Sequence, residues 1–429
     1  MKFPKGFLLG AATAAHQVEG NNTHSDCWAM EHMTHTSYVE PSLDAVDHYR
    51  RYDEDIQLLA EAGLNAYRFS IEWARIEPEE GMFDETEVEH YHSVIRCCKE
   101  HGVEPIVTLH HFSSPKWLIT KGGWEADTTP GDFARYVRYV MGRLGGELNY
   151  VCTINEANMG IQVAAIAKRY MQQMMAKAAA AKTDGTVQVG MNLEKMMANQ
   201  EAAAKECVAV FGVPKVEMFT NPRTERGDGI VMEAHKAARA VIRETSPHIK
   251  VGLTLSLHDI QALPGGEENA LQEWAEEFTH YLPAIADDDF LGVQNYTRSR
   301  VDSTGSLPTP EGAELTQMDY EFYPEALENV IRKVHEDFPG ELIVTENGIA
   351  TGDDARRMEF IRRALQGVHS CMTDGIPVKG YCYWSLLDNF EWQKGYSMTF
   401  GLIAVDRKTQ TRFPKESLAY LGGMKEKLQ

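Results

Sequence analysis

The chain has 429 residues, of which 43% are hydrophobic and 9% aromatic, so a large buried core is expected and a disordered chain is not. Its 63 acidic and 42 basic side chains leave a formal net charge of -21, which repels the phosphates of nucleic acids and anionic lipids. Nucleic-acid and membrane partners are therefore not expected. No stretch approaches the length of a transmembrane helix.

The seven cysteines indicate a reducing compartment. They are odd in number, scattered and mostly set within apolar patterns, which is typical of small buried side chains rather than disulfides. The N-terminal stretch MKFPKGFLLGAATAAHQVEG is similar to a signal peptide only superficially, because a glycine interrupts its apolar run and polar residues follow directly. We therefore expect a cytoplasmic protein. No C-x-x-C pair or H-E-x-x-H helix suggests a metal, and no cofactor is expected.

Eight strand-like apolar runs recur along the chain, each followed by a stretch with helical periodicity. In chain order they are FLLGAATAA (7–15), AYRFSI (66–71), EPIVTLHH (104–111), YVCTINEAN (150–158), KVGLTLSL (250–257), DFLGVQNYT (289–297), ELIVTENG (341–348) and VKGYCYWSLLD (378–388). The stretch YRRYDEDIQLLAEAG (49–63) is typical of the helical segments. Its Tyr52, Ile56, Leu59 and Ala60 form one stripe, and Gly63 is a helix stop.

This alternation predicts an α/β fold, a (β/α)₈ TIM barrel. Near-continuous apolar strands are typical of a parallel sheet covered by helices, and eight strands close such a barrel. No Pro/Ser-rich linker divides the chain, so residues 1–429 are predicted to form a single barrel domain. The longest departure is the Ala- and Met-rich stretch 169–212, interpreted as helical packing or, alternatively, as an adaptable Met-lined wall beside the binding mouth.

Polar side chains gather where the strand-like runs end, and in such a barrel the chemistry lies at the C-terminal ends of the strands. Glu156 and Glu346 end the fourth and seventh runs, so they are predicted to face each other across the mouth. Hydrolysis of a glycosidic bond needs two such carboxyl groups. Taken singly, most of the other polar residues are more often structural, but together they suit a sugar. They are Gln17, Glu19, Arg68, His110, His111, Asn155, Gln294, Asn295, Tyr296, Asn347, Trp384, Asp388, Asn389, Glu391 and Trp392.

These motifs make the chain resemble the family 1 glycoside hydrolases, the β-glucosidase and β-galactosidase group. The similarity runs from FLLGAATAAHQVEG through AYRFSIEWARIEPEEG, TINEAN and LIVTENG to WSLLDNFEW, nearly the whole chain. The resemblance implies a retaining enzyme that hydrolyses terminal non-reducing β-D-glycosides by double displacement. A β-glucosidase is the main expectation, with galactoside and fucoside activity open. The implied partner is a small β-glycoside, and a homo-oligomer is compatible with the sequence.

The resemblance also assigns roles to residues that match family motifs. Glu346 of TENG matches the nucleophile and Glu156 of TINEA the general acid/base. Arg68 and Tyr296 would keep Glu346 ionised, whereas Glu156, facing that charge without a cation of its own, is expected to have a raised pKa. The positions that match sugar-binding residues are Gln17, His111, Asn155, Gln294, Tyr296, Trp384, Glu391 and Trp392.

Three positions depart from the family pattern around the sugar. Ala157 stands where most members have proline, which predicts a looser Glu156. Asn295 and Phe112 replace a tyrosine and a tryptophan, so the glycone and aglycone stay open.

Three other functions remain as alternatives. A 6-phospho-β-glycosidase is disfavoured because Glu391 would repel phosphate and the YSMTFG loop lacks that branch's Lys and Tyr. A transglycosylase would use the same catalytic residues. A sugar-binding pseudoenzyme is disfavoured because both acids stand in intact motifs.

Overall fold

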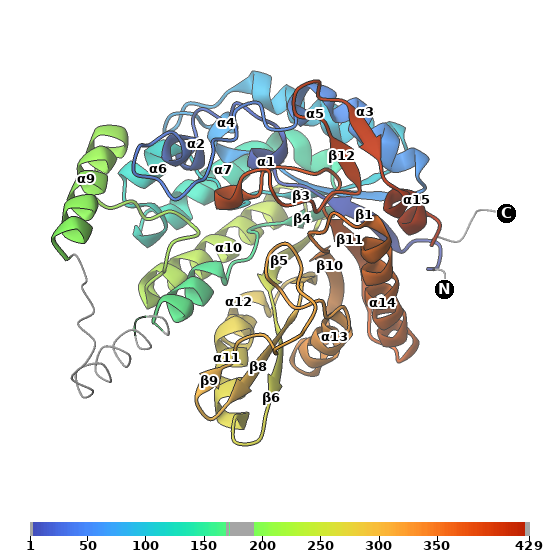
Figure 1. Cartoon of the computed structure of the whole chain (residues 1–429). Helices are drawn as coiled ribbons and strands as arrows, with labels where there is room; N and C mark the ends of the chain where they lie inside the picture. Colours follow the sequence, from blue (N-terminus) through green and yellow to red (C-terminus); the bar gives the residue numbers. More distant parts are fainter. Residues whose placement is uncertain (1–2, 169–170, 172–192, 425–429) are drawn as a thin grey trace, which may run out of the picture.

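The computed structural model describes residues 3–168, 171 and 193–424, and its centre is a closed barrel of parallel strands (Figure 1). All eight predicted strands are present, so the predicted fold class is confirmed. Around the barrel the strands follow chain order, and β1 closes the ring by pairing with β11. The strands are β1 (Leu8–Ala12), β2 (Ala66–Ser70), β3 (Glu104–Thr108), β4 (Tyr150–Cys152), β5 (Lys250–Ser256), β7 (Phe290–Gln294), β10 (Glu341–Asn347) and β11 (Val378–Trp384).

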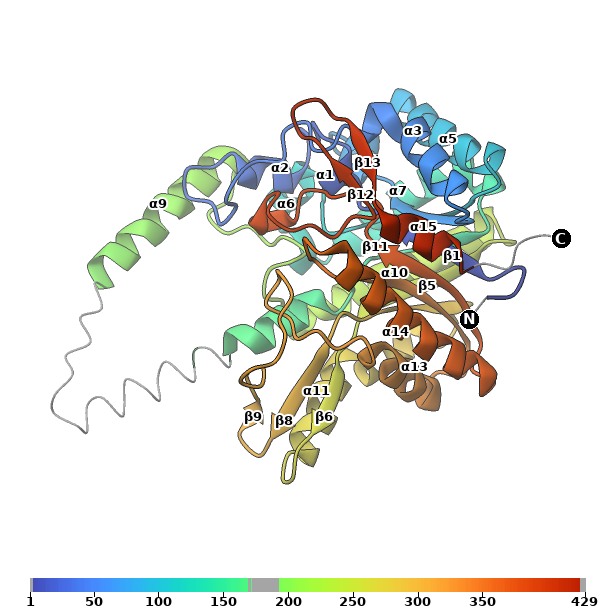
Figure 2. The ribbon, with the colours of Figure 1, turned by 45° about the vertical axis from the view of Figure 1, so that its right-hand side comes forward.

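Helices surround the barrel as an outer layer (Figures 1 and 2). The longer ones are α3 (His48–Glu61), α5 (Glu85–Glu100), α7 (Thr129–Leu144), α9 (Leu193–Phe211), α10 (Glu225–Thr245), α11 (Glu267–Glu277), α13 (Ala326–Asp337) and α14 (Asp354–Thr373). The shorter ones are α1 (Ala15–Val18), α2 (Asp26–Glu31), α4 (Trp73–Ile76), α6 (Lys116–Thr120), α12 (Leu282–Ile285) and α15 (Glu416–Gly422). The single 3₁₀ turns in the part of the chain that the structure describes are η1 (Gly123–Glu125), η2 (Gly145–Glu147), η3 (Thr279–Tyr281) and η4 (Trp392–Lys394).

The packing of α3 shows why these helices cover the barrel. Ile56 and Leu59 are fully buried, and Tyr52 and Ala60 pack against the same core at its edge. The helix ends at Glu61, and Gly63 follows with φ of +98°, a left-handed conformation that favours glycine. The predicted stripe and stop signal are therefore confirmed.

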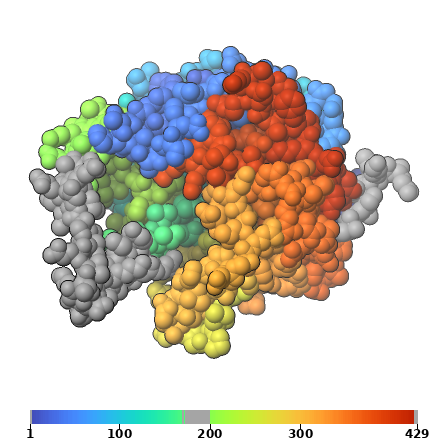
Figure 3. Space-filling model, viewed as in Figure 1, coloured from blue at the N-terminus to red at the C-terminus, as the bar shows by residue number. Residues whose placement is uncertain are grey.

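Among the described residues, two small sheets lie outside the barrel. One consists of β6 (Asp259–Ala262), β8 (Arg298–Asp302) and β9 (Gly305–Ser306), and the other of β12 (Ile403–Val405) and β13 (Arg412–Pro414). Near the second sheet, segments from the two ends of the chain pack side by side, blue against red in Figure 3. The Tyr396 hydroxyl donates to the Ser42 carbonyl at 2.5 Å, and Arg407 pairs with Asp44 at 3.1 Å. The N-terminal loops are thereby fixed beside the strand ends.

Several expectations about single segments meet the structure here. All seven cysteines are buried, as predicted, and their thiols are free. Within residues 3–168, 171 and 193–424, no helix combines the length and apolar character needed to cross a bilayer. Of the Met-rich stretch, residues 169–170 and 172–192 lie outside the described residues, so the predicted Met-lined wall stays a prediction for them.

Small residues inside the barrel let its strands approach closely. A Cβ atom on Gly10 of β1 would lie 2.0 Å from the Ala66 carbonyl oxygen of β2, a backbone atom that cannot move aside without breaking the ring. Overpacking of this kind costs about 1–3 kcal/mol. We therefore expect Gly10→Ala to lower the thermal unfolding midpoint by about 1–3 °C.

A matched control separates this clash from the general effect of alanine. A Cβ atom added to Gly142, which is exposed on α7, would have no neighbouring side chain or other element within 4 Å, and alanine favours helix by about 0.5–1 kcal/mol. Gly142→Ala should therefore leave the midpoint unchanged or raise it. Equal midpoints for the Gly10 variant and the unaltered protein, in parallel thermal melts, would contradict the close packing inferred at Gly10.

Candidate active site

A cavity of about 300 Å³ lies at the C-terminal ends of the barrel strands, and both predicted acids, Glu156 and Glu346, line it. The other predicted residues that line it are Gln17, His111, Tyr296, Trp384, Glu391 and Trp392. Arg68, Asn155 and Gln294 are also buried here, but they lie beneath the lining as a supporting layer. The fold therefore brings together, at the strand ends, predicted residues as far apart in sequence as Gln17 and Glu391.

Glu346 enters the cavity because β10 carries a bulge. Ile343 and Thr345 point into the barrel, so in a regular strand Glu346 would face outward. Pairing with β7 shifts register between Val344 and Glu346, and the extra residue turns the Glu346 side chain inward.

The predicted partners of Glu346 are in place. Arg68 Nη1 donates to Oε1 at 2.6 Å, and the Tyr296 hydroxyl donates to Oε2 at 2.6 Å. Burial nevertheless raises the pKa of Glu346, although Arg68 and Tyr296 oppose the rise. Arg68 and Tyr296 thus favour the ionised form of Glu346, while desolvation acts against them.

Glu156 lies just past β4 with its backbone in the left-handed region, at φ of +43°. This conformation costs a residue other than glycine about 1–2 kcal/mol, and such strain is typical of functional sites. The Glu156 N–H donates to Thr254 Oγ1 at 3.0 Å, and the Ala157 N–H donates to the Thr254 carbonyl at 3.1 Å. Phe112 and Trp392, which also line the cavity, have φ of +67° and +43°.

The electrostatics of the site separate the two acids. Burial, followed by repulsion from Glu346, raises the pKa of Glu156 well above its ordinary value. Its carboxylate has no ion-pair partner among the described residues, whereas that of Glu346 is paired with Arg68. A proton shared by the two acids is therefore held preferentially by Glu156, as the sequence predicted.

Asn155 joins the other members of the supporting layer to His111. Its Oδ1 accepts from Arg68 Nη2 at 2.6 Å and from Gln294 Nε2 at 2.7 Å, and its amide donates to His111 Nε2 at 3.1 Å. Burial, together with the Arg68 charge, lowers the pKa of His111 well below its ordinary range, so this ring is neutral. Gln294 therefore helps to orient Asn155, and because its own Oε1 is buried without a hydrogen-bond partner among the described residues, its predicted sugar contact stays a prediction.

Gln17 and Glu391 form another part of the cavity wall. Gln17 Nε2 donates to the Phe390 carbonyl at 2.8 Å and to Glu391 Oε2 at 3.3 Å. Burial and the Glu346 charge raise the pKa of Glu391 to about 8. Among the described residues, Gln17 Oε1 and His111 Nδ1 are buried without a hydrogen-bond partner. Buried polar atoms are normally paired, so these two are suited to a polar ligand.

Aromatic rings complete the wall around these polar atoms. His111 stacks on Trp384 and Trp392 with ring centroids 5.7 and 6.2 Å apart. Phe112 packs against Trp392 at 5.3 Å and against Phe219 at 5.8 Å. Flat rings beside amide and carboxylate groups can hold both the C–H face and the hydroxyl edge of a sugar.

Sequence reasoning missed a further group of lining residues. Ser256 is the last residue of β5, and the others lie between or after the barrel strands, where no local signal marked them: Tyr38, Met159, Thr220, Met318, Tyr320, Gln393, Lys394 and Phe400. The two methionines, Met159 and Met318, lie outside the Met-rich stretch in which an adaptable wall was predicted.

The three departures from the resemblance differ in their effect. Phe112 lines the cavity, so the change there alters the site directly. Asn295 donates to the Leu257 and Thr297 carbonyls and does not line the cavity. Ala157 is fully buried, and its N–H makes a bond that proline could not make.

Several other strand-end residues serve the framework. His110 contacts Ser114 Oγ at 3.0 Å and packs on Trp124, on the opposite side of β3's end from His111, as alternation predicts. Asp388 pairs with Lys415, and Glu19 pairs with Arg75. Among the described residues, no group of three or more His, Cys, Asp or Glu side chains is arranged to hold a metal ion.

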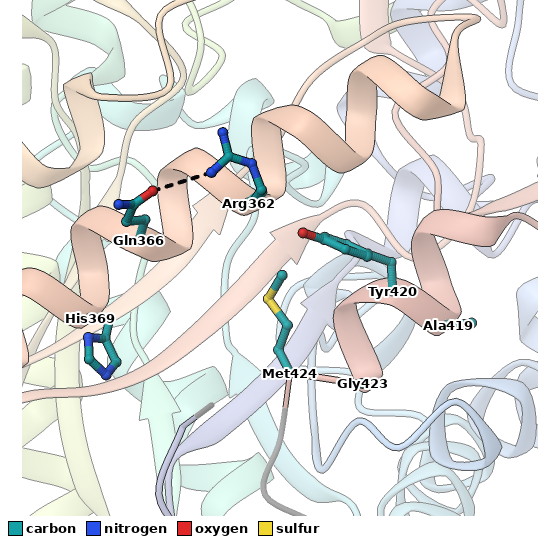
Figure 4. A pocket seen from close by; sticks show the side chains of 7 residues that line it. All are labelled: Arg362, Gln366, His369, Ala419, Tyr420, Gly423 and Met424. Carbon is teal, nitrogen blue, oxygen red and sulfur yellow. Dashed lines mark hydrogen bonds between the residues drawn. The ribbon is translucent and has the colours of Figure 1, made fainter. Parts of the chain in front are cut away.

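A second cavity, of about 710 Å³, lies on the outer wall between α14 and α15 (Figure 4). Arg362, Gln366 and His369 reach it from α14, and Tyr420 and Met424 from α15 and the residues after it. It is larger than the first cavity, but no carboxylate lines it. The paired acids therefore identify the smaller cavity as the candidate active site.

Comparisons with known proteins agree with this geometry. The sequence model described as glycosyl hydrolase family 1 matches residues 1–218 and 275–428. The chain is 31% identical to a 1,4-beta-D-glucan glucohydrolase of Thermotoga neapolitana, over 97% of this chain and 96% of the relative. It is 28% identical to a 6-phospho-beta-galactosidase of Lacticaseibacillus casei, over 99% and 98%. The structure of beta-glycosidase BGL167 has a TM-score of 0.85 and 44% identity, covering 98% of this chain and 96% of that one.

Proposed function

Because the chain belongs to glycosyl hydrolase family 1, and is thus a glycoside hydrolase, we propose that it hydrolyses unphosphorylated β-glucosides with retention of configuration. The observation that carries this proposal is the pair of buried acids in one cavity, only one of which is bonded to a cation. Retention requires one acid that attacks and one that carries a proton. The unequal surroundings of Glu346 and Glu156 supply that difference.

In the first step, Glu346 attacks the anomeric carbon while Glu156 protonates the departing oxygen. The bond from that carbon to the aglycone oxygen breaks, and a covalent glycosyl ester of Glu346 forms. The Arg68 guanidinium and the Tyr296 hydroxyl favour the ionised, attacking form of Glu346. Because its pKa is raised, Glu156 is protonated at the start of the reaction and can donate that proton to the leaving group.

In the second step, Glu156 acts as a base. Formation of the ester removes the Glu346 charge, which is one of the causes of the raised Glu156 pKa. Glu156 then accepts a proton from water as the water oxygen attacks the anomeric carbon. The sugar leaves with its original configuration, and both acids return to their starting states.

Sugar recognition would use the other residues that line the cavity or lie beneath its lining. Gln17 Oε1 and His111 Nδ1 are available to sugar hydroxyls, Glu391 accepts or donates according to pH, and Trp384 and Trp392 provide flat apolar faces. Asn155, oriented by Arg68 and Gln294, is proposed to bond the hydroxyl next to the anomeric carbon, a contact that strengthens in the transition state.

A panel of nitrophenyl α- and β-glycosides tests the proposal, with galactosides, fucosides and 6-phospho-glycosides included. Release from unphosphorylated β-glucoside, with none from the α-anomer, is expected. The 6-phospho alternative is included because one relative is named a 6-phospho-beta-galactosidase and Lys394 lines the cavity. Faster release of nitrophenol from the 6-phospho-glycosides would contradict the proposed unphosphorylated substrate. Added alcohol acceptors would show transglycosylation if glycoside products outweigh free sugar.

The pH dependence of the reaction should follow the two acids. The rate rises with pH as Glu346 loses its proton and falls as Glu156 loses its own. The Tyr296 hydrogen bond lowers the pKa of Glu346, so Tyr296→Phe is expected to move the acid limb of kcat/KM to higher pH. Tyr136→Phe is the matched control, because its buried hydroxyl donates to the Ile71 and Leu109 carbonyls and does not line the cavity. An acid limb that stays in place in Tyr296→Phe would contradict the assignment of Glu346.

We also propose a cytoplasmic location. Seven buried free thiols suit a reducing compartment, where cysteines are kept from pairing. Cell fractionation of the native host would check it, and activity found in the extracellular fraction would refute it.

A further inference from the structure

Arg223 ties the loop before α10 to the backbone just after Glu156. Its Nη1 donates to the Ala157 carbonyl at 2.8 Å, and its Nη2 donates to the Phe219 carbonyl at 2.8 Å. Its own backbone N–H donates to the Gly160 carbonyl at 3.1 Å. The side chain is 2% exposed and does not line the cavity. It also lies in residues 219–274, which the family sequence model does not match.

The surroundings of Arg223 are shaped to this side chain. A Cβ atom on Gly160 would lie 2.7 Å from its Cζ, and a Cβ on Gly227 would lie 2.7 Å from its Cγ. The guanidinium stacks over the Phe219 ring, 4.6 Å from the centroid. The glycines at positions 160 and 227 thus leave room for the Arg223 side chain, which a larger residue at either position would crowd.

The hydrogen bond from Arg223 to the Ala157 carbonyl matters because Ala157 directly follows Glu156, whose backbone is strained. Glu156 holds a left-handed φ of +43° and has no partner for its carboxylate among the ion pairs of the described residues. Its N–H is bonded to Thr254 on one side, and on the other side Arg223 bonds the carbonyl of Ala157. We propose that Arg223 is a positioning residue that fixes this strained turn and so aims Glu156 at the leaving-group oxygen.

Arg223 acts by holding the backbone in position and not by its charge. Its Nη1 lies 3.7 Å from Asp228 Oδ1, so its charge is offset by a carboxylate away from the cavity. The Phe219 carbonyl accepts a second hydrogen bond from the Arg223 guanidinium. The Phe219 ring packs on Phe112, which lines the candidate active site. Removal of Arg223 is therefore expected to loosen the proton donor first.

This inference rests on the proposed role of Glu156, and the test includes it. Kinetics of Arg223→Met, Arg223→Lys and Glu156→Ala are measured on two β-glucosides, one with a dinitrophenolate leaving group and one with methanol. Only the second needs full protonation, and misplacement of a catalytic group by about 1 Å costs about 100-fold. Arg223→Met is therefore expected to lose roughly 10–100-fold more kcat/KM on the methyl glucoside than on the dinitrophenyl glucoside.

Two further readouts separate positioning from general stability. A loosened Glu156 is more hydrated, and since burial is the main cause of its raised pKa, the alkaline limb of Arg223→Met should move to lower pH. Arg223→Lys keeps one donor group and should recover part of the difference; if Arg223→Met fails to fold, the lysine variant carries the comparison. Arg412→Met removes another buried arginine, bonded to Asp55 and the Val46 carbonyl, and should lower stability with equal losses on both substrates.

The outcomes distinguish the positioning role from the catalytic one. A substrate difference in Glu156→Ala without one in the Arg223 variants would overturn the positioning role and leave the proposed function intact. Equal losses on both substrates in Glu156→Ala would overturn the acid/base role of Glu156, and the positioning role would fall with it.

Discussion

Replacing Glu346 with glycine should abolish hydrolysis, with a loss of about 10⁴-fold or more, the scale seen when a hydrolase loses its covalent nucleophile. The space vacated beside Arg68 and Tyr296 can admit a small anion. Azide is therefore expected to restore cleavage of dinitrophenyl β-glucoside, with azide nitrogen bonding to the anomeric carbon as dinitrophenolate leaves. Because only one displacement occurs, the product should be the α-glucosyl azide, identified by NMR.

Glu244→Gly is the control for this variant. Glu244 is an exposed carboxylate paired with Arg138 on the outer surface, so its loss should change neither turnover nor the response to azide. Retention of near-normal hydrolysis in Glu346→Gly, in a sample shown to be folded by its thermal midpoint, would remove the nucleophile assignment.

Replacing Glu156 with alanine should produce a loss that depends on the leaving group. A general acid contributes about 10²–10⁴-fold, and an alkyl glucoside needs that proton whereas a dinitrophenyl glucoside does not. We expect the logarithm of kcat/KM to fall steeply with leaving-group pKa in the variant and only weakly in the unaltered enzyme. A series of aryl and alkyl β-glucosides measures the two slopes.

Azide gives a second, independent signature for Glu156→Ala. Glu346 is intact in this variant, so azide attacks the glycosyl ester after a first displacement, and the product should be the β-glucosyl azide. The two variants thus predict azides of opposite configuration. An α-azide from Glu156→Ala, or parallel slopes in the leaving-group series, would reverse or remove the role assigned here.

The barrel could be predicted from the sequence because its evidence is local. Each strand carries its own apolar run, as in ELIVTENG, and each helix its own stripe, as in α3, so eight repeats of one pattern were readable without knowledge of contacts. Because the C-terminal ends of parallel strands meet at one edge, Glu156 and Glu346 could then be placed at the same mouth of the barrel. Both predictions depend only on chain order and periodicity.

The supports of the site could not be read in this way. Thr254 bonds Glu156 across 98 positions of sequence and Arg223 bonds Ala157 across 66, and no motif marks either of them. Strict alternation would have turned Glu346 outward from β10, and the bulge that turns it in is seen only when β10 is paired with its neighbours β7 and β11. The hydrogen bond that Gln294 donates to Asn155 across 139 positions was likewise not predicted from the sequence.

By itself, then, the sequence determined the number and order of strands, the motifs at their ends and the presence of two acids in one mouth, because hydrophobic periodicity and residue identity are written along the chain. Only the tertiary structure decided how each acid is held and charged. A pKa depends on burial and on neighbours from other strands, as the raised pKa of Glu346 beside Arg68 illustrates. Such quantities exist only after distant segments have packed together.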